Sequence, residues 1–309
     1  MNFAQLKKEC MMDILKSMPE FFLSGFYDPS AITSDFSNRS GIKKFTTIEN
    51  LFENSDVINI VSSTDTHFQI AQQAMRQLKP IFIEKPVTIN LNQARTLQDI
   101  ANEAGIKVQT GHVERFNPAF LAALNYIENP LYIESHRLSE IKSGKNHPDV
   151  LEDLMVHDID IMLQLIDSPI KKINASAVGI FNGDPDFVNA RIEFENGCTA
   201  SLNASRVAVR KMRITRVFQK DASISINFLE NKTGIIRNNH QLNEPELYFP
   251  EVTPSNAIEN ELRHFHSSVT RGKNPEVNLD HAIRALTVAE HIKDILKLQT
   301  NFYTNQAIS

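Results

Sequence analysis

The sequence lacks the features that mark several specialised protein classes. Its 309 residues include only two cysteines, Cys10 and Cys198, which are too few for a disulfide framework or a four-thiolate zinc site. No apolar run approaches the roughly 18 residues of a membrane span. The first 20 residues are charged and contain no apolar signal-peptide core. We therefore expect a cytoplasmic protein that does not associate with a membrane.

An excess of charge of one sign is also missing. The formal net charge is −5 and no long basic run occurs, so a nucleic-acid partner is not predicted. The histidines and cysteines show no HExxH or CxxC spacing, and no metal site is predicted. A GxSxG nucleophile elbow and a Walker A loop are absent as well. The remaining classes are ordinary globular proteins, for which this length predicts about two domains.

Short apolar runs alternate with helix-patterned stretches in the first half of the chain. Strands are expected at residues 21–27, 57–61, 80–83 and 106–110, and the continuous apolar character of residues 57–61 is typical of a buried strand. Helices are expected at residues 67–77 and 91–104, with Gly105 as a stop signal for the second. Strand–helix–strand alternation is typical of a doubly wound parallel sheet. We predict an α/β, Rossmann-like dinucleotide-binding domain over residues 1–115.

The second half has closely spaced strands and a hairpin signal. Asn196-Gly197 lies between two alternating runs, which is a strong indication of a two-residue β-turn. Strands are expected at residues 187–195, 198–205, 212–219, 222–228 and 233–237, and closing helices at 256–270 and 279–298. We predict an α+β domain with a large, mostly antiparallel sheet over residues 116–309, for substrate binding and oligomerisation.

A lysine directly follows one of the predicted parallel strands. Glu84-Lys85-Pro86 comes after residues 81–83, and ligands of open α/β sheets bind beyond the carboxyl ends of the strands. The proline favours an extended backbone at Lys85, which restricts where its ammonium group can reach. A lysine in a solvated surface turn is the alternative.

A carboxylate and an imidazole share one face of a predicted helix. Asp153 and His157 are four residues apart in a stretch with helical apolar spacing. A carboxylate beside an imidazole orients the ring and stabilises its charged form, as a general base requires. A helix-start acid next to an ordinary surface histidine is the alternative.

Two further segments carry candidate ligand-binding residues in the first domain. Residues 62–67, with the sequence SSTDTH, lie between a strand and a helix, where hydroxyl groups and free amides can hold a phosphate or a ribose. Helix capping alone also explains this composition. Asp28 ends a predicted strand, the usual place of the acid that binds an adenosine ribose, although Asp-Pro is also a common turn.

The joint between the two predicted domains carries polar residues. The stretch GHVERFNP at residues 111–118 follows a strand and opens a helix. Within it, Arg115 and Asn117 are suited to phosphate, carboxylate or sugar hydroxyl groups. A structural joint held by buried polar groups is the alternative.

Taken in order, these motifs resemble those of the Gfo/Idh/MocA oxidoreductases. The resemblance extends from about residue 7 to the C-terminus and includes SSTDTH, EKP at 84–86 and D-x-x-x-H at 153–157. The stretches GHVERFNP and DLMVHD are similar to a subgroup that includes the UDP-N-acetylglucosamine 3-dehydrogenases. The family implies hydride transfer between a sugar carbon and nicotinamide. The subgroup implies that the sugar belongs to a nucleotide sugar. We expect NAD rather than NADP as the cofactor.

The resemblance also implies roles for individual residues. The catalytic set is Lys85, Asp153 and His157, with His157 as the general base on a sugar hydroxyl. The cofactor-binding set is Asp28, Ser62, Thr64, His67, Glu84 and Lys85. The substrate-binding set is Arg115, Asn117, Asp153 and His157. The family further implies a homodimer or homotetramer formed through the sheet of the second domain.

One family feature is not found in this sequence. The family has a first strand and a G-x-G-x-x-G turn before its first helix, whereas no glycine precedes Gly25 here. Without these glycines the backbone cannot closely approach a pyrophosphate. Either the natural N-terminus is longer, or the protein is a degenerate member that binds a sugar or serves in assembly without NAD. The retained Lys85, Asp153 and His157 favour the first explanation.

Overall fold

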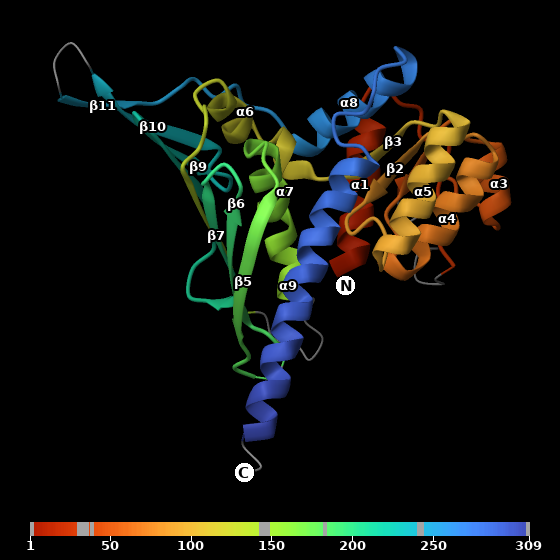
Figure 1. Ribbon diagram of the computed structural model, residues 1–309. Helices are drawn as coiled ribbons and strands as arrows, with labels where there is room; N and C mark the ends of the chain where they lie inside the picture. The colour runs from red at the N-terminus through yellow and green to blue at the C-terminus, as the bar shows by residue number, and fades with distance from the viewer. Residues whose placement is uncertain are drawn as a thin grey trace. The chain divides into compact units, whose positions relative to one another are not determined.

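The computed structural model describes residues 3–29, 37, 40–141, 149–181, 184–239 and 244–306 (Figure 1). Two compact units form: Met1–Gly111 with Ile258–Ile283, and His112–Ala257 with Arg284–Ser309. Residues 258–283, near the end of the chain, therefore belong to the first unit. The predicted domain boundary near residue 115 assigns them to the second domain. No helix in the described ranges is both long and apolar enough to cross a bilayer.

The first unit contains a parallel sheet, as the alternation of strands and helices predicts. Its order is β1-β2-β3, and both neighbouring pairs run parallel. The strands are β1 (Ile58–Ile60), β2 (Ile81–Glu84) and β3 (Val108–Gly111). The connecting helices are α4 (Thr64–Arg76) and α5 (Leu91–Ala104). Gly105 ends α5 in the left-handed conformation, with φ 66°, which confirms the predicted helix stop.

Three more helices belong to this unit: α1 (Phe3–Ser17), α3 (Ile48–Glu53) and most of α8 (Ala257–Thr270). Met11 and Leu15 of α1 form a buried cluster with Phe82 of β2 and with Leu262 and Phe265 of α8. The apolar residues of α8 are spaced along one face of the helix, which explains why it packs here.

The predicted strand at residues 21–27 is only partly formed. The segment forms a single parallel bridge, in which the Phe26 amide donates to Lys43 O at 2.9 Å and the Phe45 amide donates to Phe26 O at 2.8 Å. No described strand pairs with its other edge. A strand is stabilised by its neighbours, so the segment remains extended without a full ladder.

The second unit is built on an eight-stranded sheet of order β11-β10-β9-β8-β4-β7-β6-β5. Only the β4–β7 pair is parallel, which confirms the predicted mostly antiparallel sheet. The predicted hairpin is present, but its turn is shifted by one residue. The Gly197 amide donates to Phe194 O and the Phe194 amide donates to Cys198 O, so Glu195 and Asn196 are the central residues of the turn and Gly197 follows them with φ 87°. The strands are β4 (Tyr132–Glu140), β5 (Ile170–Val178), β6 (Phe187–Phe194), β7 (Thr199–Ala208), β8 (Met212–Gln219), β9 (Ala222–Asn227), β10 (Lys232–Asn239) and β11 (Glu244–Tyr248).

Helices cover one face of this sheet (Figure 1). They are η2 (Val113–Phe116), α6 (Pro118–Leu124), the π-helical turn η3 (Leu151–Met155), α7 (Val156–Leu165) and α9 (Leu279–Gln306). Met155 and Ile159 are buried with Leu202, Val217 and Ile292 in one large core. The core therefore lies between the helices and the alternate apolar residues of the strands.

A buried carboxylate fixes one end of this sheet. Asp186 accepts a hydrogen bond from Arg206 Nε at 2.5 Å and from the amides of Ile180 and Phe181 at 2.6 and 3.0 Å. Burial alone would raise the pKa of Asp186, but these donors outweigh it and hold the pKa below its usual range. The ionised form is therefore favoured in the folded protein.

Replacing Asp186 with asparagine should lower the free energy of unfolding by roughly 1–3 kcal/mol at pH 7. The stabilisation by a carboxylate with a lowered pKa is complete above its unfolded pKa of about 4 and is lost as the pH falls through the folded pKa. The difference from wild type should therefore shrink below about pH 4, as measured by urea unfolding. The exposed Asp184→Asn is the control, and a constant difference at all pH values would contradict the assignment.

Candidate functional site

Polar residues lie at the carboxyl ends of the parallel strands β1 and β2 of the first unit. Glu84 ends β2, Lys85 follows it, and Glu84 Oε2 accepts the Lys85 amide at 3.3 Å. Gly111, at the end of β3, pairs with Glu84. A Cβ atom on Gly111 would lie 2.7 Å from Glu84 Oε2, so this close approach requires glycine. Ligands of open α/β sheets bind at this edge.

His67 connects the loops that follow β1 and β2. Its ring is 1% exposed, with Nδ1 2.9 Å from Pro86 O and Nε2 3.0 Å from Ser62 O. Thr66 Oγ1 donates to Ser62 Oγ at 2.7 Å. These contacts hold Ser62 and Lys85-Pro86 near one another, while Thr64 begins α4. A direct cofactor role for Ser62, Thr64 and His67 stays a prediction.

Asp28 and Ser62 both line one cavity of about 480 Å³ in the first unit. Asp28 is 9% exposed and follows the extended segment at residues 21–27. The structure thus brings together two of the predicted cofactor-binding residues, although they are 34 positions apart in the sequence.

These residues fit an NAD molecule in part. The Asp28 carboxylate can accept hydrogen bonds from a ribose, and the first-turn amides of α4, whose N-cap Ser63 makes no side-chain capping bond, can hold an anionic group. Lys85 and Glu84 are at the edge where the nicotinamide end would lie. Among the described residues that line the cavity, the one glycine is Gly25, so the cavity lining contains no G-x-G-x-x-G turn for the pyrophosphate.

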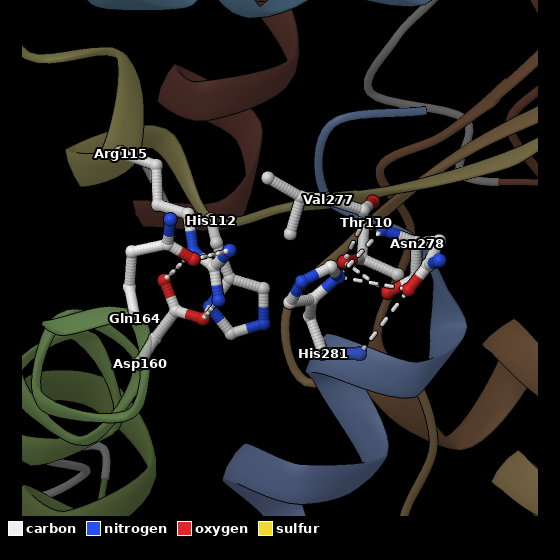
Figure 2. A network of polar contacts seen from close by, with 8 residues as sticks. All are labelled: Thr110, His112, Arg115, Asp160, Gln164, Val277, Asn278 and His281. Atoms are coloured by element: carbon white, nitrogen blue, oxygen red, sulfur yellow. Dashed lines mark hydrogen bonds and ion pairs between the residues drawn. The ribbon is translucent and has the colours of Figure 1, made fainter. Parts of the chain in front are cut away.

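A network of buried charges lies in the second unit (Figure 2). Arg115 makes two hydrogen bonds to Asp160, from Nε at 2.8 Å and from Nη2 at 2.6 Å. Its Nη1 donates to Gln164 at 2.7 Å, and His112 Nδ1 lies 3.6 Å from Asp160. The Arg115 side chain is 5% exposed. These contacts anchor η2 to α7. They are of the kind predicted by the alternative interpretation of residues 111–118, a structural joint held by buried polar groups.

Asn117 also has protein partners. Its Oδ1 accepts the Ala119 amide and caps α6, and its Nδ2 donates to Phe228 O at 3.1 Å. The amide therefore fixes the start of α6 against the loop after β9. The substrate-binding roles of Arg115 and Asn117 stay predictions, and the structure shows that both side chains already have positioning contacts.

A second buried network centres on Arg137 of β4, which the sequence patterns did not reveal. Arg137 donates to Asp158 from Nε at 2.9 Å and to Glu114 from Nη1 at 2.8 Å. Burial alone would lower the pKa of Arg137, but Asp158 and Glu114 outweigh it and raise the pKa. An arginine among the alternating residues of a strand looks solvent-facing in sequence. Its two carboxylate partners, 21 and 23 residues away, could not be assigned to it from one sequence.

Arg213 extends this network toward the predicted catalytic residues. It lies opposite Arg137 in the β4–β8 ladder, 3.7 Å from Glu114. Burial and the charge of Arg137 lower the pKa of Arg213, whereas Glu114, Asp158 and Asp153 act to raise it. Asp153 is therefore within electrostatic range of this arginine. Arg213 is a candidate functional residue that sequence reasoning missed.

Asp153 lies in the π-helical turn η3 and His157 in the first turn of α7. Both side chains are half-buried. The predicted helix is thus present but is wider at Asp153 than an α-helix. Such π-helical turns occur frequently at functional sites. Lys85 belongs to the other unit, and its catalytic role beside His157 stays a prediction.

Residues 277–281, in the C-terminal part of the first unit, are bonded to β3 through their backbone carbonyl groups. The Thr110 amide donates to Val277 O at 2.8 Å, and Thr110 Oγ1 lies within hydrogen-bond distance of the carbonyls of Val277 and Asn278. His281 Nδ1 is 2.8 Å from Asn278 Oδ1 (Figure 2). These bonds hold residues 277–281 against β3.

A Rossmann-like sheet with polar loops at its carboxyl edge, together with a second α+β unit, defines a class of NAD-binding oxidoreductases. Residues 4–112 match the model described as the oxidoreductase family with an NAD-binding Rossmann fold. Residues 135–225 match the GFO/IDH/MocA C-terminal domain. The chain belongs to the Gfo/Idh/MocA family of oxidoreductases.

Characterised relatives act on sugars or inositols. The chain is 31% identical over 219 residues to UDP-N-acetylglucosamine 3-dehydrogenase from Acidithiobacillus ferrooxidans, a match that covers 69% of each chain. A structure of that enzyme has a TM-score of 0.88 at 25% identity and covers 94% of both chains. The scyllo-inositol 2-dehydrogenase (NAD(+)) of Bacillus subtilis is 26% identical, covering 72% of this chain and 70% of its own. Levoglucosan dehydrogenase in complex with NADH and levoglucosan shares the fold, with a TM-score of 0.83.

Proposed function

We propose that the protein is an NAD-dependent dehydrogenase that oxidises a secondary hydroxyl group of a nucleotide sugar. The observation that carries this proposal is the 31% identity to a UDP-N-acetylglucosamine 3-dehydrogenase, in a chain that has Lys85, Asp153 and His157 at the family's catalytic motifs. The relatives that act on inositols support the broader class of cyclic polyols and sugars.

In this proposal each side chain handles one part of the reaction. A bound NAD would supply the acceptor for the hydride of the sugar carbon. The His157 imidazole takes the proton of the hydroxyl group as the C=O bond forms. The Lys85 ammonium group stabilises the negative charge that develops on the oxygen. Asp153, one turn before His157, orients the imidazole or a neighbouring sugar hydroxyl.

The cofactor preference follows from Asp28. Its carboxylate would accept hydrogen bonds from the adenosine ribose and would repel the 2′-phosphate of NADP. Ser62 and the amides at the start of α4 would bind the neighbouring part of the cofactor. Glu84 and Lys85 would lie nearer the nicotinamide.

The open face of the second unit's sheet supports a homo-oligomer. Tyr132, Phe218, Ser223, Ile236 and Leu247 are successive cross-strand partners from β4 to β11. Phe218, Ile236 and Leu247 are 37%, 52% and 60% exposed. A row in which exposed apolar residues alternate with the half-buried Tyr132 and Ser223 favours a face-to-face contact with a second copy, as a homodimer or as part of a homotetramer.

The function can be tested with the purified chain and a substrate panel. UDP-N-acetylglucosamine, scyllo-inositol and free N-acetylglucosamine are each incubated with NAD, and NADH is followed by its absorbance. We expect turnover that is fastest with the nucleotide sugar. Equal rates with the free sugar would contradict the nucleotide-sugar assignment, and no turnover together with no NAD binding would contradict the dehydrogenase.

A non-catalytic sugar-binding or assembly protein is the second candidate. Among the described residues that line the cavity, Gly25 is the one glycine, which favours this candidate because a pyrophosphate needs close backbone contact. Isothermal titration separates the two candidates. The second one requires saturable sugar binding without NAD binding, whereas micromolar NAD binding would exclude it.

A further inference from the structure

The connection between β7 and β8 in the second unit is rich in positive charge. Residues 206–213 have the sequence RVAVRKMR, in which four of eight side chains are basic. Arg206 is paired with Asp186. Arg210 and Lys211 are exposed, and neither forms an ion pair with another described residue. The residues with roles in the proposed reaction include none of these cations.

Arg213 lies on the face of the sheet that the helices cover. It is directly opposite Arg137 in the β4–β8 ladder, and directly opposite residues share one face of a sheet. Arg137 donates to Asp158 of α7 and to Glu114 of η2, which identifies this face as the helix-covered one. Arg213 is therefore on the same side of the sheet as η3 and α7, the two segments that contain the predicted catalytic residues of this unit.

The guanidinium group of Arg213 has hydrogen-bonding capacity that the described residues do not use. Its one ion pair among them is with Glu114 at 3.7 Å, which is beyond hydrogen-bond distance. Glu114 Oε1 already accepts a hydrogen bond from Arg137 at 2.8 Å. A guanidinium group has five N–H donors, and the Arg213 side chain is 44% exposed. A ligand can therefore reach these donors.

The surroundings of Arg213 favour one more negative charge. Burial and the positive charge of Arg137 lower the pKa of Arg213 by more than the surrounding carboxylates raise it. Arginine stays protonated at neutral pH even when its pKa is lowered, so its charge is incompletely compensated. An anion that binds to Arg213 would supply the missing compensation.

A nucleotide sugar has such an anion beside its sugar ring. Its diphosphate group is joined directly to the anomeric carbon, so the negative charge lies within a few bonds of the ring hydroxyl groups. Asp153, a predicted catalytic residue, is close enough to Arg213 to act on its pKa. A sugar ring bound at Asp153 would therefore bring its diphosphate group toward Arg213. A guanidinium group can donate two parallel hydrogen bonds to phosphate oxygens.

We propose that Arg213 binds the diphosphate group of the substrate and so determines the preference for a nucleotide sugar over a free sugar. This inference rests on the proposed nucleotide-sugar dehydrogenase function and adds a specificity-determining residue to it. The exposed Arg210 and Lys211 add positive potential that attracts the anion. A purely structural role, in which Arg213 only compensates the charge of Glu114, predicts a loss of stability without a change in substrate preference.

The kinetic test compares Arg213→Met with wild type on UDP-N-acetylglucosamine and on free N-acetylglucosamine. For the nucleotide sugar, KM should rise about 10–100-fold while kcat changes little, because the diphosphate contact is equally strong in the ground state and the transition state. The free sugar should show no change in kcat/KM. Arg213→Lys keeps the charge but not the planar fork, so its KM should rise less. Arg216→Met is the matched control, because Arg216 is 39% exposed on the same strand and should leave KM unchanged.

A binding measurement separates this inference from the dehydrogenase function. Calorimetry with UDP alone, with and without NAD, should show saturable binding to wild type and to Arg216→Met. Binding to Arg213→Met should be at least about tenfold weaker. Equal UDP binding by Arg213→Met and wild type, or no UDP binding by wild type in either condition, overturns the inference.

The two measurements together show which of the two proposals fails. If wild type oxidises the nucleotide sugar and Arg213→Met keeps its KM, the dehydrogenase function stands and the role of Arg213 is wrong. If wild type shows no turnover but binds UDP through Arg213, the dehydrogenase function is wrong and the diphosphate site stands.

Discussion

Replacing Arg137 with methionine is expected to lower the free energy of unfolding by roughly 3–5 kcal/mol. The Arg137 side chain is 2% exposed and faces Asp158 and Glu114, whose side chains are 3% and 8% exposed. Removal of the guanidinium leaves two buried carboxylates, and among the described residues the remaining ion pair of Glu114 is with Arg213, at 3.7 Å. The measurement is urea unfolding followed by circular dichroism at pH 7.

The control for this prediction is Arg216 on the adjacent strand. Arg216 pairs with Glu134 at 3.2 Å, but its side chain is 39% exposed. An exposed ion pair contributes about 0–1 kcal/mol, so Arg216→Met should have a small effect. The variant that combines Arg137→Met with Glu114→Gln and Asp158→Asn should regain part of the stability, because it removes all three buried charges of the Arg137 network. Equal effects of the two single variants would show that burial does not determine this energy.

The repeated elements of the fold could be predicted because their signals are local. The helix α5 ends where Gly105 predicted, and the Asn196-Gly197 turn joins two alternating runs. The strands β4 and β5 were missed as elements. β4 carries Glu134 and Arg137, and β5 contains Lys171 and Lys172, so their apolar alternation is interrupted by charge.

The candidate site likewise has residues that could be predicted from the sequence and contacts that could not. The residue types and the order of Lys85, Asp153 and His157 could be read from short motifs. The partners of Arg115 and Arg137 could not, because Asp160 and Asp158 are brought to them by the packing of α7 against η2 and β4. The partly formed strand at residues 21–27 has a similar cause. Its apolar pattern is local, but its ladder depends on a neighbour that the described residues do not provide.

Replacing His157 with alanine is expected to lower kcat by about 10²–10⁴-fold, which is the range for loss of a general base. Lys85→Ala should lower kcat by about 10²–10³-fold, because the charge on the reacting oxygen is no longer stabilised. Both side chains are half-buried, so truncation should change Tm little. The assay is NADH formation from the nucleotide sugar at saturating substrate.

Matched residues in each unit separate catalysis from general effects of the substitutions. His291 is an exposed histidine of α9 in the second unit, and His291→Ala should keep wild-type kcat. Lys107 precedes β3 at the opposite end of the parallel sheet and bonds Asn274, so Lys107→Ala should also keep it. Asp153→Asn should shift the pH profile of kcat, because a positioning carboxylate favours the charged imidazole. Turnover that survives both His157→Ala and Lys85→Ala within a few-fold would show that another group removes the proton.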